Sequence, residues 1–183
     1  MWYPAVVAAP TAEPVSLEQV KAHSREFSEE ADAVLMTMLK ASRAHIEAAC
    51  GARFATRTGV QMICDGFSDL ERLPEAPVSV ISSISYVDTS GATQTLSSTV
   101  YELRASGLEA AIVLKYGQSW PATQPGSRII VTATVGGTIP EDVAHAILML
   151  TAHFYDHRSA VGENSSELPF AVNSLICNHR RGV

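Results

Sequence analysis

Three histidines near the C-terminal third of the chain are the residues whose types and spacing could support chemistry. His145, His153 and His157 are separated by multiples of four residues, so in a helix they line up along one face. Two histidines one turn apart can bind zinc, but a metalloprotease of the HExxH type needs Glu at 154, where this chain has Phe154. We favour packing or polar capping of a buried face for these side chains. A metal-dependent hydrolase that uses the three histidines remains the alternative.

The other reactive residue types form no recognisable site. Cys50, Cys64 and Cys177 are far apart and form no CxxC pair, so we interpret them as small hydrophobic side chains in a reducing cytoplasm. The acidic segment 65–69 lacks the ligand order of a calcium loop, and the glycine pair 136–137 lacks the Lys-Ser/Thr of a phosphate loop. We therefore predict that the chain is not an enzyme and has no catalytic residue, no metal site and no cofactor.

Two helices are predicted near the start of the chain from apolar residues at helical spacing. The first covers 16–24 with Ser16 as its N-cap, and the second covers 29–50 with Ser28 as its N-cap. Gly51 suits the left-handed position that ends the second helix.

The middle of the chain alternates between apolar and polar residues, which predicts antiparallel strands. In the segment 78–86, Val78, Val80 and Ile84 fall on even positions and serines fall on odd ones. Between 128 and 135 the apolar residues again occupy alternate positions and share one face. The predicted strands are 58–64, 78–86, 93–96, 99–104, 110–115 and 128–135.

The helix predicted for 140–157 contains no charged residue from Val143 through Tyr155. A helix that is apolar on nearly all sides is buried on more than one side. We expect the chain's own sheet to cover one side of it and a neighbouring subunit to cover the other. A polar linker at 159–167 and a last short helix at 168–177 follow.

The composition of the 183 residues favours a subunit that hides surface against its neighbours. Apolar residues make up 46% of the chain and charged residues only 17%, below the usual quarter. The formal net charge is −6 and there is no basic block, so the chain lacks the positive surface that binds nucleic acid tightly. The chain has no charged signal-peptide start and no apolar stretch of about 20 residues, so we expect no membrane association.

These elements predict an α+β fold with N-terminal helices, a central antiparallel β region and C-terminal helices packed on it. We expect three parts: an extended, proline-containing arm at 1–15, an α+β domain at 16–158, and a linker with a C-terminal segment at 159–183.

The order of several short motifs resembles the head–tail connector (adaptor) family of siphophages and related gene transfer agents. The similarity extends over about residues 16–180, and each motif is weak alone, while the ordered set is fairly specific. The motifs are SRAHIEAACG at 42–51, LPEAPVSVISSISYVD at 73–88, YGQSWP at 116–121, IPEDVAHAI at 139–147, HFYDHR at 153–158 and LPFAV at 168–172.

This resemblance implies a structural subunit of a virion neck. Such subunits form a ring beneath the portal, extend the DNA channel and join the capsid vertex to the next neck component, a stopper or tail terminator. The implied partners are other copies of the chain, expected to be twelve to match the portal, together with the portal protein. DNA would pass through the lumen without tight binding, and assembly would take place in the bacterial cytoplasm.

The resemblance also leads us to expect two sets of contact residues. The lateral interface between subunits would use Val143, Ile147, Leu148, Met149 and Ala152. Docking to the portal would use Leu168, Phe170, Leu175, Arg180 and Arg181.

Overall fold

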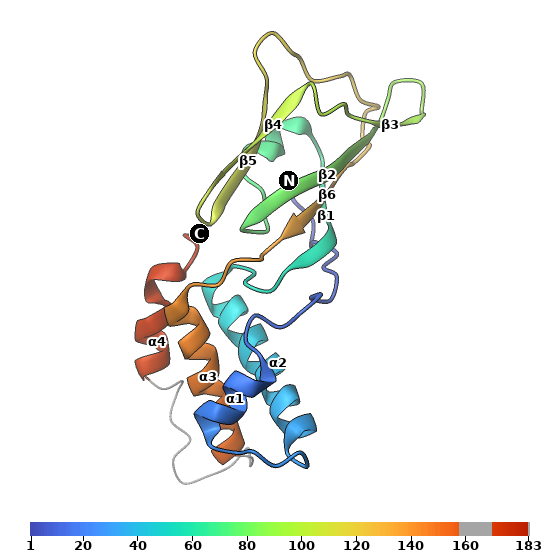
Figure 1. Cartoon of the computed structure of the whole chain (residues 1–183). Helices are drawn as coiled ribbons and strands as arrows, with labels where there is room; N and C mark the ends of the chain where they lie inside the picture. Colours follow the sequence, from blue (N-terminus) through green and yellow to red (C-terminus); the bar gives the residue numbers. More distant parts are fainter. Residues whose placement is uncertain (158–169, 183) are drawn as a thin grey trace. The chain divides into compact units, whose positions relative to one another are not determined.

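The computed structural model describes residues 1–157 and 170–182 and divides into two compact units (Figure 1). One, which we call the β unit, contains Met1–Ala12 and Arg53–Gly137. The other, the helical unit, contains Glu13–Ala52 and the described part of Thr138–Val183. Helices and antiparallel sheets together confirm the α+β class, but the two units group the chain differently from the three expected parts.

The β unit is built from a four-stranded antiparallel sheet and a separate two-stranded hairpin. The sheet has the order β1-β6-β2-β3, and the hairpin pairs β4 with β5. All six strands lie within two residues of the predicted ranges. They are β1 Arg57–Cys64, β2 Val78–Val87, β3 Thr93–Thr95, β4 Tyr101–Ser106, β5 Glu109–Leu114 and β6 Ile129–Val135, with a short 3-10 helix, η1, at Phe67–Glu71.

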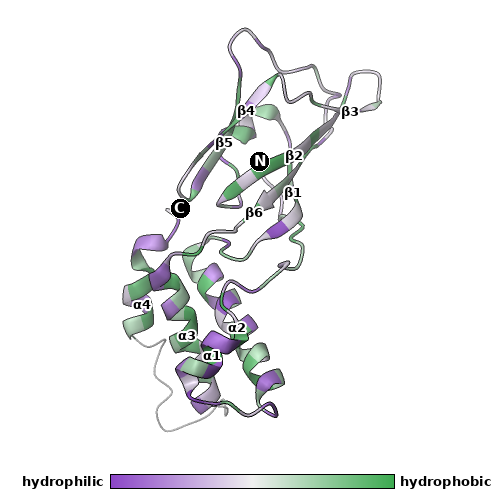
Figure 2. Cartoon of the chain, viewed as in Figure 1, coloured by the Kyte–Doolittle hydropathy of each residue, from purple (hydrophilic) through white to green (hydrophobic). Residues whose placement is uncertain are grey.

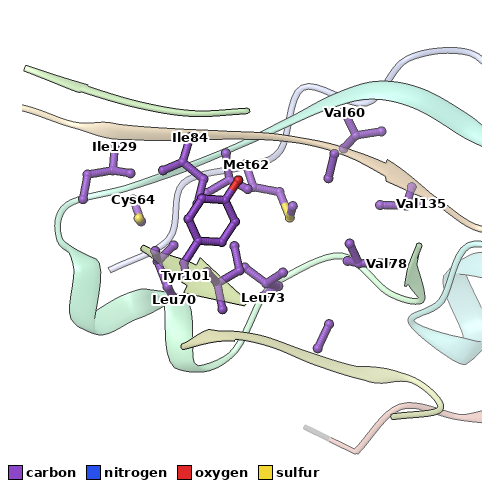
Figure 3. Packing of buried hydrophobic residues seen from close by; sticks show 14 of the residues in the cluster. Val60, Met62, Cys64, Leu70, Leu73, Val78, Ile84, Tyr101, Ile129 and Val135 are labelled. Atoms are coloured by element: carbon purple, nitrogen blue, oxygen red, sulfur yellow. The ribbon is translucent and has the colours of Figure 1, made fainter. Parts of the chain in front are cut away.

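The core of the β unit forms where the inner face of the sheet meets the hairpin and η1 (Figure 3). The predicted alternation holds along β6, where every second side chain from Ile129 to Val135 is buried. It fails in β2, because Val80 is exposed and Ile81 instead packs toward the core. The register between β2 and β6 shifts on both sides of this pair, as a β-bulge requires.

The N-terminal residues lie along β1 as an extended segment. Trp2 forms a bridge to Cys64 and Val6 forms a bridge to Gln61, both antiparallel. Backbone groups of Val6 and Gln61 exchange two hydrogen bonds, with N···O distances of 2.9 and 3.1 Å. The predicted arm is therefore extended, and its first twelve residues belong to the β unit.

The helical unit contains four α-helices, with α3 packed against the other three. The sequence predicted a sheet on one side of this helix, whereas within this unit its neighbours are helices. The pattern of apolar residues shows that a helix is covered, but does not distinguish what covers it. The bounds are α1 Leu17–Ser24, α2 Asp32–Cys50, α3 Glu141–Asp156 and α4 Phe170–Ile176, followed by the 3-10 turn η2 at Cys177–His179.

Local capping explains the start of α1 and the end of α2. Ser16 caps α1 as predicted, and Gly51, with φ of 62°, ends α2. The prediction of Ser28 as the cap of α2 is wrong, because its hydroxyl accepts the N–H of Glu30 in a turn that precedes the helix. The helix itself begins at Asp32.

Gly136, at the end of β6, occupies a position that no other residue fits. Its φ is +79°, and a Cβ added there would lie 2.3 Å from the backbone oxygen of Ala55. Its N–H donates to the carbonyl of Pro77 at 2.9 Å, so the backbone cannot move away without losing this bond. Gly117 has nearly the same φ, +76°, but a Cβ added there would meet no atom within 4 Å.

This pair of glycines separates the steric cost of a side chain from the cost of a left-handed backbone. Gly136→Ala is expected to lower the free energy of unfolding by about 3 kcal/mol, since it adds a backbone clash to the unfavourable φ. Gly117→Ala carries only the second cost, about 1 kcal/mol. Urea unfolding followed by circular dichroism measures both. Equal losses in the two variants would contradict the close approach at Ala55.

Candidate functional site

The three histidines do not come together as one site. His145 lies edge-on to His23, with ring centroids 5.7 Å apart, whereas His153 stacks on His157 at 4.5 Å. Within residues 1–157 and 170–182, no group of three or more His, Cys, Asp or Glu side chains is arranged to hold a metal ion. The geometry of the described residues therefore gives the hydrolase alternative no support.

The two buried cysteines are held in the unreactive thiol form. Burial raises the pKa of Cys50 to about 11 and that of Cys64 to about 11, so both thiols stay protonated at neutral pH. Cys177 is exposed on η2.

A buried cluster of charges in the helical unit has a structural role. The Arg43 guanidinium donates to Glu13 at 2.6 Å and to Glu47, one turn along α2, at 2.9 Å. One cation thus satisfies two carboxylates, of which Glu47 is almost completely buried. Removing the guanidinium would take this ion pair away from two largely buried carboxylates, which is costly. Because Arg43 and Glu47 belong to α2, the ion pair with Glu13 holds residue 13 against that helix.

The outer face of α3 carries three of the five residues predicted for the lateral interface. Leu148, Met149 and Ala152 are partly exposed. Val143 and Ile147 have no exposed surface, so they are core residues of this structure and the prediction of a lateral contact for them is corrected. Figure 2 shows much of α3 in green, the colour of hydrophobic residues. One side of the helix is buried by the chain, and the other side is partly exposed.

A second exposed face lies on α2, and we did not predict it from the sequence. Its exposed members follow one another at alternating spacings of three and four residues, the period of a helix-packing seam. All are small, so another helix can approach closely. The spacing of these residues can be read from the sequence, but apolar residues of the buried face recur at the same helical period, so the two faces were not distinguished. These residues are Val34, Thr37, Ala41, Ala44 and Ala48.

The C-terminal segment is docked on its own unit rather than free. Val172 and Ile176 of α4 are completely buried, and α4 packs against α3. The N–H of Arg181 donates to the carbonyl of Cys50 at 2.7 Å. The side of α4 that points away from this contact includes Phe170, which is 87% exposed.

The remaining residues predicted for portal docking have mixed positions. Leu175 is half-buried, Arg180 is exposed and Arg181 is partly exposed, while Leu168 lies outside the described residues. His179 contacts the Asp142 carboxylate of α3 at 2.6 Å. This contact holds the pKa of Asp142 below its usual value and fastens η2 to the start of α3.

No helix in the described part of the chain is both long enough and apolar enough to cross a membrane. Exposed apolar side chains on α2 and α4 and partly exposed ones on α3 offer surfaces for contacts with other proteins.

The fold is similar to that of known protein structures. Three solved chains resemble the structure. A chain in the neck of an empty gene transfer agent (GTA) particle, computed with C6 symmetry, matches with a TM-score of 0.77 at 23% identity, covering 100% of this chain and 96% of its own. A chain in the virion of a native GTA particle matches with a TM-score of 0.77 at 21% identity, covering 99% and 97%. A chain in the neck of a native GTA particle, computed with C12 symmetry, matches with a TM-score of 0.67 at 24% identity, covering 97% and 96%.

These likenesses show a shared fold over almost the full length of each chain. No match was found among curated proteins. A family model, described as head completion protein, matches residues 13–181 and so includes all four helices and all six strands. This match confirms the resemblance drawn from the ordered motifs. The chain belongs to the head completion protein family.

Proposed function

We propose that this chain is a structural head–tail connector subunit, located in the virion neck, that joins the capsid vertex to the tail side of a tailed phage or gene transfer agent. The observation that carries the proposal is the family match over residues 13–181. The fold shared with chains of GTA necks and virions supports the same location. The role needs contact surfaces and no reaction, in keeping with what the described residues offer.

A ring of identical subunits joins two different faces at each contact, because rotation brings one patch of a copy against another patch of the next. The helical unit offers two such faces. Leu148, Met149 and Ala152 of α3 form a larger apolar ridge, and the small residues of α2 form a seam that can receive one. We infer that these faces meet in the ring. Twelve copies would match the symmetry of the GTA neck computed with C12 symmetry.

The portal would be met by the outward side of the C-terminal segment. Phe170 is a large exposed aromatic side chain, and Arg180 provides an exposed positive charge nearby in the sequence. Aromatic and arginine side chains are the residue types that contribute most at protein interfaces. The buried side of α4 holds the segment in place while this side stays free to bind.

DNA would pass through the ring without being held. The chain has 19 acidic and 13 basic residues, and a net charge of −6 gives little attraction to phosphate groups. An acidic channel wall would let the duplex slide. The next neck component, a stopper or tail terminator, would bind the other side of the ring.

Loss of the chain tests the proposal most directly. Particles made without it are expected to be filled heads that carry a portal but no tail, because nothing joins the two parts. Electron microscopy of particles from a strain that lacks the gene measures this, with the restored wild-type gene as the control. Normal numbers of tailed particles without the chain would refute the function.

A charge placed on either helix face should block the ring. Leu148→Glu, Met149→Glu and Ala41→Glu each put a carboxylate into the inferred contact, where its desolvation is costly. The copies of the chain bound per portal are expected to fall at least about tenfold, since each 1.4 kcal/mol lost is a factor of ten. Quantitative mass spectrometry of purified portal complexes measures the copy number.

The matched control is Ala105→Glu, which adds the same charge at an exposed position of the β unit. The measurement is made on the portal rather than on free protein, because a weak lateral contact becomes effectively intramolecular on a multivalent template. Unchanged copy numbers for the α3 variants would show that this face lies outside the ring contact.

Portal docking is tested by two neighbouring residues of α4. Phe170→Ser removes an exposed aromatic side chain and is expected to weaken portal binding at least about tenfold with little change in stability. Val172→Ser places a hydroxyl in the core and is expected to cost about 2–3 kcal/mol of stability. Deleting 168–181 should abolish portal binding but, since the strands form a separate unit, should leave the β unit folded. Portal pull-down and urea unfolding measure the two effects, and full binding by Phe170→Ser would move the contact elsewhere.

A further inference from the structure

The β unit has several stretches of about twelve residues without a charged side chain, and two of them are mostly exposed loops at the ends of its strands. These two are 89–101, which includes β3, and 116–127, which connects β5 to β6. At the average content of 17%, 25 residues would include about four charges. Most of these residues are exposed, so the absence of charge is not explained by burial. We call the two together the neutral segments.

The neutral segments lie side by side at one end of the β unit (Figure 1). The N–H of Lys115 donates to Val100 at 3.0 Å, and its ammonium group donates to the carbonyl of Ser98 at 2.8 Å. Gln124 donates its N–H to Val87 at 3.0 Å, next to a bridge between Asp88 and Thr123. The neutral segments therefore form one continuous region rather than two unrelated loops.

The turn that precedes β3 is ordered before any partner arrives. The Asp88 carboxylate accepts hydrogen bonds from Ser90, from the N–H of Ala92 and from the side chain of Gln94. These bonds, that of the Ser90 hydroxyl above all, lower the pKa of Asp88 to about 2. A surface that is already ordered loses little conformational entropy on binding.

The outer edge of β3 has unpaired backbone groups within the described structure. Asp88 donates to Ala92 and Leu96 donates to Ile84, so in β3 the N–H and C=O groups of Gln94 face β2. By the same alternation, those of Thr93 and Thr95 point away from β2. All three residues of β3 are exposed, and the strand has none of the charges, prolines or bulges that usually protect an edge.

We propose that the neutral segments are a docking surface for a different protein, which adds an uncharged extended strand along the outer edge of β3. Main-chain hydrogen bonds to Thr93 and Thr95 would give the contact its register. Tyr116 belongs to the other neutral segment, and its fully exposed side chain would offer the same partner an aromatic contact. The inference rests on the proposed function, because we expect the partner to be the next protein of the neck.

The chemistry of the surface favours this partner over others. Interfaces between proteins are depleted of charge and enriched in aromatic residues at their centre. The antigen-binding loops of antibodies combine tyrosine with serine, glycine and asparagine. The neutral segments have a similar composition. Lys115, which borders them, bonds its ammonium group to Ser98, and a single lysine is not the basic cluster that binds nucleic acid. Charged groups on the partner would lose their hydration against such a surface, so an uncharged strand fits best.

A proline at position 95 tests the strand addition. Proline is tolerated on an edge strand when its missing N–H would face outward, so Thr95→Pro should keep the pairing of β3 with β2. Thr95→Pro and Tyr116→Lys are each expected to reduce tailed particles at least tenfold, while filled heads retain this chain at wild-type copy number. Ala105→Lys is the matched control, and urea unfolding of each purified variant verifies the fold.

The outcomes separate this inference from the proposed function. Heads that keep the variant chain but lack the next neck component support the docking surface. Tailed particles at the level of the control overturn it, and so do heads that have lost the chain itself, because the surface would then serve the ring or the portal. If the wild-type chain is absent from the neck, the proposed function fails independently of these variants.

A photo-reactive benzoylphenylalanine at Thr93 identifies the occupant in assembled particles. The expected product is a cross-link to a protein other than this chain, identified by mass spectrometry. A cross-link to a second copy of the chain or to DNA overturns the inference. The same group at Ser106, exposed at the far end of the β4–β5 hairpin, is expected to give no cross-link to that protein.

Discussion

The absence of Asp, Glu, Lys and Arg from the middle of α3, between its charged ends, is the constraint on which the helical unit depends. From Val143 to Tyr155 there is no Asp, Glu, Lys or Arg side chain, so this stretch of the helix has no strongly hydrated carboxylate, ammonium or guanidinium group. Three helices of the same chain cover Val143, Ile147 and Leu150, but Leu148 and Met149 stay partly exposed. The helical unit covers most of this helix and leaves one side of it partly open.

The two units differ in the chemistry of their surfaces and interiors. The helical unit has apolar helix faces and an internal charge cluster in which Arg43 holds Glu13 and Glu47. The β unit has an apolar core inside and hydroxyl and amide groups on the neutral segments outside. Apolar faces suit permanent contacts between identical copies, while polar, uncharged loops suit recognition of a different protein.

Periodic elements could be predicted from the sequence because their signal is local. The alternation in β6, the Ser16 cap and the Gly51 helix end depend on residues that are neighbours in the chain. The bulge that exposes Val80, the turn that takes the Ser28 hydroxyl and the burial of Ile147 depend on residues far away or on competing hydrogen bonds. For the same reason, the set of residues predicted for an interface on α3 mixed the inner and outer faces of the helix.

A low content of charge has different meanings in the two units. In α3 it follows in part from folding, since Val143, Ala146, Ile147 and Leu150 are buried by the chain itself. In the neutral segments folding gives no such reason, because exposed loops tolerate lysine and glutamate freely. Elsewhere on the surface this chain does use charges, as in the exposed pair of Arg72 and Glu109. An exposed surface that stays uncharged without a folding reason is best explained by a partner that covers it.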